Sequence, residues 1–60
     1  MNTENYAILK FIYAKYNELN SIKKYVTDDV TLKIIEAKQD TLNDMEKVIE
    51  STITANILNS

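Results

Sequence analysis

The chain has 60 residues, 45% of them hydrophobic, and a formal net charge of −2. It contains no Gly, Pro, Cys or His, so it lacks the usual turn-forming residues, thiol nucleophiles, imidazole bases and transition-metal ligands. A chain this short buries only about 60% of the surface that it exposes when unfolded. These properties predict one all-α domain without a catalytic, metal or cofactor site, stabilised by self-association.

The first helix is predicted over residues 3–26. Asn2 or Thr3 can cap its start, and the carboxylate of Glu4 suits the positive end of the helix dipole. Apolar side chains recur along one stripe, which we expect to face the core. The stripe consists of Ile8, Ile12, Tyr16, Leu19, Ile22 and Val26.

A turn is predicted at residues 27–28. The side chain of Thr27 or Asp28 can accept hydrogen bonds from the first N–H groups of a second helix. Because the chain has no glycine, this turn must form without the left-handed residue that ends many helices. One continuous helix through this point is the alternative interpretation.

The second helix is predicted over residues 28–58, with a C-terminal end that frays because β-branched and polar residues dominate it. Its apolar face consists of Leu32, Ile35, Leu42, Met45, Ile49 and Ile53, with Ile34, Thr52 and Asn56 at its margins. The face thins at residues 38–41, where Asp40 or Thr41 could cap a third helix. Ala37, Lys38 and Gln39 are good helix formers and favour continuity. The predicted fold is therefore an antiparallel helical hairpin, with a compact three-helix bundle as the alternative.

Two helices alone leave one side of their apolar stripes in water. We therefore expect the hairpin to dimerise into a four-helix bundle, which covers that side. The predicted oligomer core consists of Ile8, Phe11, Ile12, Leu19, Ile22, Ile35, Leu42, Met45 and Ile49.

Residues 6–16 are apolar almost all the way round a helix, which indicates burial on more than one side. Tyrosine is enriched at binding hot spots, so this segment predicts a docking site for another protein. The predicted partner-binding residues are Tyr6, Leu9, Tyr13 and Tyr16. The alternative is that the same segment forms the wide core contact of a homodimer.

Aromatic, lysine and asparagine side chains alternate along one outer side of the first helix, a pattern that could stack on bases and hold phosphates. They are Tyr6, Lys10, Tyr13, Asn17, Asn20 and Lys24. A dimerising hairpin of this size resembles the plasmid copy-number regulators of the Rop type, which implies binding of structured RNA through the first helices. The acidic balance and the absence of arginine make nucleic acid the less favoured partner.

Glu36, Asp40 and Asp44 form an acidic ridge at four-residue spacing, which could bind a divalent cation but is more typical of a solvated helix face. In length and layout the chain is also similar to the sporulation aspartyl-phosphate phosphatases of Gram-positive bacteria, a resemblance that implies phosphatase activity. Their Ser-Gln-x-Leu-Asp signature is missing: the nearest stretch, residues 38–44, has neither the serine nor the spacing.

The sequence favours a small non-enzymatic interaction or regulatory protein: an inhibitor, an adaptor or an assembly factor. No basic leader or long apolar run is present, so we expect no signal peptide, no membrane span and a cytoplasmic location. Ile, Lys, Asn and Tyr, which have AT-rich codons, make up 26 of the 60 residues. That bias indicates a low-GC bacterium or phage as the source.

Overall fold

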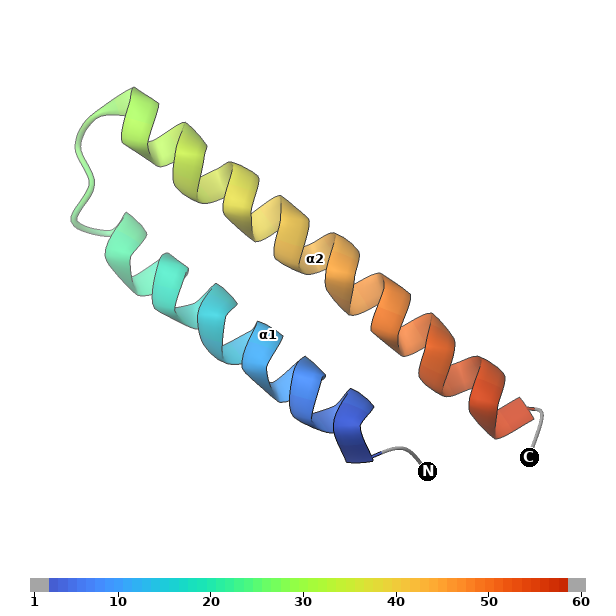
Figure 1. Cartoon of the computed structure of the whole chain (residues 1–60). Coiled ribbons are helices and arrows are strands. Elements are labelled where there is room, and N and C mark those ends of the chain that lie inside the picture. Colours follow the sequence, from blue (N-terminus) through green and yellow to red (C-terminus); the bar gives the residue numbers. More distant parts are fainter. Residues whose placement is uncertain (1–2, 59–60) are drawn as a thin grey trace.

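The computed structural model describes residues 3–58, which form two α-helices and no strand. Helices α1 (Thr3–Lys23) and α2 (Asp29–Leu58) run side by side in opposite directions, joined by a short turn (Figure 1). The predicted all-α helical hairpin is therefore confirmed over these residues. The three-helix alternative is wrong, since α2 continues unbroken through Asp40, and so is the single continuous helix.

The turn covers residues 24–28, so α1 ends three residues earlier than predicted. The Tyr25 N–H donates to the Ile22 carbonyl over 2.9 Å, and the Val26 N–H to the Lys23 carbonyl over 3.3 Å. These bonds span three residues and tighten the end of the helix. None of the described residues has a positive φ. The chain thus ends α1 without the left-handed residue that glycine would supply.

Asp28 caps the start of α2. Its Oδ2 accepts a hydrogen bond from the Thr31 N–H over 2.8 Å, and its carbonyl accepts one from the Leu32 N–H over 3.1 Å. Hydrogen bonds from the Thr31 side chain and then the Thr31 backbone hold the pKa of the Asp28 carboxyl below its ordinary value. Of the two expected caps, the chain uses Asp28. Asn2, expected as a cap for α1, lies outside the described residues.

The end of α2, predicted to fray, is helical as far as Leu58, and residues 59–60 lie outside the described part. Thr52 and Thr54 each donate a side-chain hydrogen bond to the carbonyl four residues earlier, on Val48 over 3.0 Å and on Glu50 over 2.9 Å. Such bonds satisfy the hydroxyls within the helix itself. Two β-branched threonines are thereby accommodated in α2.

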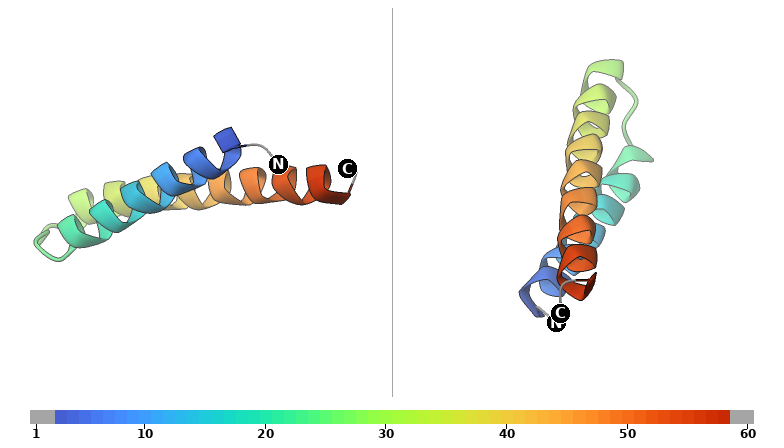
Figure 2. Two further views of the ribbon diagram at one scale, coloured as in Figure 1. Left: turned by 90° about the horizontal axis from the view of Figure 1, so that it is seen from below. Right: turned by 90° about the vertical axis from the view of Figure 1, so that its right-hand side faces the viewer.

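The two helices meet along a seam whose residues are spaced alternately three and four apart, as in a coiled coil. Figure 2 shows α1 lying at an inclination across α2. From α1 the seam takes Asn5, Leu9, Ile12, Tyr16, Leu19 and Lys23, and from α2 it takes Leu32, Ile35, Gln39, Leu42, Glu46, Ile49 and Ile53, all buried or half-buried. The buried apolar core is small and consists of Leu9, Ile12 and Ile35.

The prediction that Ile8 and Ile22 face the core is wrong, because neither residue lies in the contact between the two helices. Their side chains are 39% and 45% exposed. The seam instead uses Asn5 and Lys23 at the corresponding turns, which rotates α1 so that Ile8 and Ile22 lie beside the contact. The seam therefore follows the spacing of residues rather than apolarity alone.

Gln39 forms a buried polar layer in the seam and is only 4% exposed. Its Nε2 donates to Asn20 Oδ1 over 2.8 Å and to the Tyr16 carbonyl over 3.5 Å. Its Oε1 accepts a hydrogen bond from Lys23 Nζ over 3.4 Å. All three partners lie on α1, and a shift of α2 by one turn would break these bonds. Gln39 thus fixes the register of α2 relative to α1.

We expect Gln39→Ala to lower the free energy of unfolding by about 2 kcal/mol, because it removes hydrogen bonds and leaves a gap in the seam. Urea denaturation followed by circular dichroism measures this loss. The neighbouring exposed Asp40 provides the control, since Asp40→Ala should stay within about 0.5 kcal/mol of the wild type. Equal losses for both variants would contradict a role of Gln39 in the seam.

The Asp28 cap predicts a pH dependence of stability. Because the folded-state pKa of Asp28 is lowered from 3.8, its contribution is complete above that value and is lost as the pH falls through the lower, folded-state pKa. The melting temperature of the wild type should exceed that of Asp28→Ala by about 5 °C at neutral pH, with the gap narrowing in acid.

Asp28→Asn serves as the matched control, because asparagine caps helices as well as aspartate but does not titrate. Its melting temperature should exceed that of Asp28→Ala by an amount that does not change between neutral and acidic pH. A wild-type advantage over Asp28→Ala that did not narrow in acid would contradict the lowered pKa of Asp28.

Candidate functional site

An apolar face lies along one flank of the seam and is shared by both helices. It consists of Ile8, Phe11 and Ile22 on α1 and of Ile34, Met45 and Val48 on α2, with exposed fractions from 39% to 64%. Among the described residues twelve large hydrophobic side chains are exposed and three are buried. A hairpin has no third element to cover such a face, which makes it the first candidate for a binding surface.

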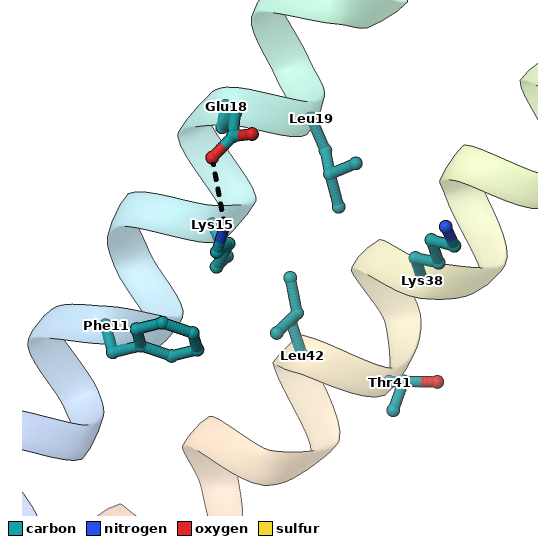
Figure 3. Close-up of a pocket in the computed structure, with 7 residues that line it drawn as sticks. All are labelled: Phe11, Lys15, Glu18, Leu19, Lys38, Thr41 and Leu42. Carbon is teal, nitrogen blue, oxygen red and sulfur yellow. Dashed lines mark hydrogen bonds and ion pairs between the residues drawn. The ribbon is translucent and has the colours of Figure 1, made fainter.

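A groove of about 440 Å³ crosses the middle of the apolar face (Figure 3). Leu19 and Leu42 point toward one another between the helices. The other residues that line the groove are Phe11, Lys15, Glu18, Lys38 and Thr41. The apolar face thus has a hydrocarbon base at its centre, with charged groups around it.

The charges at the groove are already partly paired. Lys15 Nζ lies 3.4 Å from Glu18 Oε2 and 5.7 Å from the centroid of the Phe11 ring. Both members of the ion pair are about half exposed, so the pair adds little to the stability of the hairpin. Lys38 faces the groove from α2, which leaves one more lysine than carboxylate there.

The opposite flank of the seam carries a tyrosine strip, formed by Tyr6 and Tyr13. One residue advances about 100° round a helix, so Tyr13 and Phe11 lie on opposite sides of the buried Ile12. Tyr6 and Tyr13 are 42% and 44% exposed. The Tyr13 hydroxyl donates to Glu50 Oε1 over 3.2 Å, which ties the strip to α2.

The carboxylates of α2 affect the chemistry of this strip. The pKa of the Tyr13 hydroxyl is raised above its ordinary value, first because the group is partly withdrawn from water. The hydrogen bond to Glu50 and the negative charges of Glu46 and Glu50 raise the pKa further, since they disfavour a phenolate. The tyrosine strip therefore has an acidic border.

The predicted partner-binding residues fall into two groups. Tyr6 and Tyr13 lie together on the outer flank. Leu9 is 7% exposed and packs in the seam, and Tyr16 is half-buried there. A partner could therefore reach Leu9 in the folded hairpin only by separating the helices.

The predicted oligomer-core residues also divide. Ile12 and Ile35 are buried between the helices of one chain, and Leu19, Leu42 and Ile49 are half-buried there. The four that lie on the apolar face are Ile8, Phe11, Ile22 and Met45. Sequence reasoning placed Ile34 only at the margin of the apolar face of the second helix and missed Val48, although both share the three- and four-residue spacing of Met45.

Two other kinds of site are absent from residues 3–58. The side chains of the acidic ridge are exposed, and no group of three or more potential metal ligands comes together within that range. Neither described helix combines the length and apolarity needed to cross a membrane.

Comparison of the chain with family models, curated proteins and solved structures finds no match.

The acidic border of the tyrosine strip can be tested through Tyr13. Glu50→Gln should lower the Tyr13 pKa toward its ordinary value of 10.0, because it removes a nearby negative charge but keeps an oxygen that accepts the hydrogen bond. The measurement is an NMR titration of the Tyr13 ring. Glu36→Gln, a change to a carboxylate elsewhere on α2, should leave this pKa unchanged, and equal shifts in both variants would contradict the assigned contact.

Proposed function

We propose that the chain is a non-enzymatic helical interaction protein that self-associates through its apolar face and acts by protein–protein binding. The observation that supports this function is that six of the twelve exposed large hydrophobic side chains among the described residues lie together on the apolar face. A protein that worked as an isolated hairpin would gain nothing from holding Phe11 and Met45 in water. A binding surface buries both side chains against a partner.

The surface area of the hairpin supports the same conclusion. Its accessible surface is 4749 Å², whereas a compact monomer of 6.9 kDa exposes about 4000 Å². The excess of about 750 Å² is close to the roughly 800 Å² that each partner buries in an interface of standard size. The elongated shape, 48 × 15 × 11 Å, is the source of this excess.

Association of two hairpins through their apolar faces makes a four-helix bundle, with two helices from each chain. The tyrosine strip lies on the opposite flank and stays on the outside of that bundle. It is the surface that an inhibitor, adaptor or assembly factor would present to a different protein. RNA is the less suitable partner, because Glu46 and Glu50 border Tyr13 and would repel phosphates.

Self-association can be tested directly. At tens of micromolar, light scattering should give about twice the chain mass of 6.9 kDa, and the melting temperature should rise by about 5 °C for each tenfold increase in concentration. Phe11→Asp should abolish both effects, because it places a charge on the apolar face. Asn17→Asp, a change on the outer surface, should abolish neither.

The opposite result is equally clear. A mass of one chain, together with melting that does not depend on concentration, would contradict the proposed function. Loss of self-association in Asn17→Asp as well as in Phe11→Asp would show that added charge, rather than the apolar face, is responsible.

A further inference from the structure

The groove shows which residues of the two helices lie at the same height along the hairpin. Lys15 and Glu18 of α1 line it together with Lys38 and Thr41 of α2. Because antiparallel helices advance by the same 1.5 Å per residue in opposite directions, four residues outward from this centre Phe11 is level with Met45 at one end. Ile22 is level with Ile34 at the other end.

The apolar face therefore has two apolar clusters, one on each side of a centre where Lys15, Glu18 and Lys38 surround the hydrocarbon base of the groove. The cluster on the side of the chain ends contains Ile8, Phe11, Met45 and Val48, and the cluster on the side of the turn contains Ile22 and Ile34. A second copy of this chain carries the same pattern. Two copies can therefore pack face to face in two ways that place apolar clusters on apolar clusters and charged centres on charged centres. The two ways differ in the direction of the two-fold axis.

If the axis is perpendicular to the helices, each helix packs on its own equivalent and the two turns lie at opposite ends. The cluster beside the chain ends of one copy then faces the cluster beside the turn of the other. This arrangement brings Lys38 of one copy within one helical turn of Lys38 of the other. The groove offers no carboxylate on α2 to neutralise the two lysines, so like charges would face each other across the interface.

If the axis is parallel to the helices, α1 of each copy packs on α2 of the other, and the two turns lie at the same end. Phe11 then meets Met45 of the other copy, and Ile22 meets its Ile34. Glu18 meets Lys38 of the other copy, which supplies the carboxylate that Lys38 lacks within its own chain.

The overall charges of the helices favour this second arrangement. Helix α1 carries three lysines against two glutamates, whereas α2 carries three lysines against six aspartates and glutamates. When α1 packs on α2 both within and between copies, every neighbouring pair of helices has unlike net charge. The perpendicular axis would instead place two acidic helices against each other.

We propose that the apolar face binds the same face of a second copy about a two-fold axis parallel to the helices, with α1 on α2 of the other copy and reciprocal Glu18–Lys38 ion pairs at the centre. This pairing rests on the self-association proposed above and specifies its geometry. In this dimer Lys15 keeps its ion pair with Glu18 of the same chain, and all six residues of the apolar face are covered. The hairpin exposes about 750 Å² more than a compact monomer of its mass, which is comparable with the roughly 800 Å² that each partner buries in an interface of standard size.

Spin labelling can measure the direction of the axis. The chain has no cysteine, so Ala55→Cys, at an exposed site near the end of α2, places one nitroxide on each copy. With the parallel axis both labels lie at the same end of the bundle, less than about 30 Å apart, given helix spacings of about 10 Å. With the perpendicular axis they lie at opposite ends, more than about 40 Å apart.

Charge exchange tests the central ion pairs independently. Glu18→Lys should raise the dissociation constant of the dimer by about tenfold, because it sets lysine against Lys38 of the other copy. The double variant Glu18→Lys with Lys38→Glu should restore the dissociation constant to near its original value. Circular dichroism of each variant checks that the helices persist, as expected for exposed positions.

The outcomes separate this proposal from the proposed function. A short distance with rescue by the double variant supports the pairing. A dimer with a long distance, or without rescue, overturns the pairing but leaves self-association in place. Labels without any dipolar coupling, in a protein whose mass is that of one chain, would overturn both.

Discussion

The spacing of three and four residues along the seam between α1 and α2 determines which side chains the hairpin turns outward. The seam positions include polar residues, among them Asn5, Gln39 and Glu46. Gln39 is held there by hydrogen bonds to the side chain of Asn20 and the backbone of Tyr16, so its burial carries no unsatisfied polar atom. Asn5 and Lys23 occupy seam positions in place of Ile8 and Ile22, and these two exposed side chains form part of the apolar face.

The small core of the hairpin is the reason why the proposed dimer matters for stability. With Leu9, Ile12 and Ile35 as its buried apolar residues, one hairpin removes little hydrocarbon from water relative to the chain entropy that folding costs. In the proposed dimer, packing of a second apolar face on the first adds to this burial. The free energy of folding of such a dimer includes the free energy of association and depends on protein concentration. In this proposal the same surface serves stability and assembly.

Much of the fold could be predicted from the sequence because its signals are local. The absence of glycine and proline favours helices, and an aspartate before a helical pattern indicates a cap, which Asp28 provides. The rotation of α1 could not be predicted this way. A prediction based on apolar residues alone places Ile8 and Ile22 in the contact between the helices. In the structure Lys23 and Gln39 lie there instead, and a hydrogen bond joins them across sixteen residues of sequence. Because of that rotation, the candidate site in the structure differs from the predicted one. Tyr6 and Tyr13 lie on the surface, whereas Leu9 lies in the seam.

The two flanks of the seam differ in chemistry, and that difference separates their roles. One flank is apolar with a polar centre of mixed charge, a pattern that a second copy of the chain can match. The other carries Tyr6 and Tyr13 beside the carboxylates of Glu46 and Glu50. Because the buried Ile12 lies between the flanks on α1, a change at Phe11 and a change at Tyr13 act on opposite surfaces. In the proposed function, a protein of only two helices presents two distinct surfaces in this way, one for its own copy and one for a different protein.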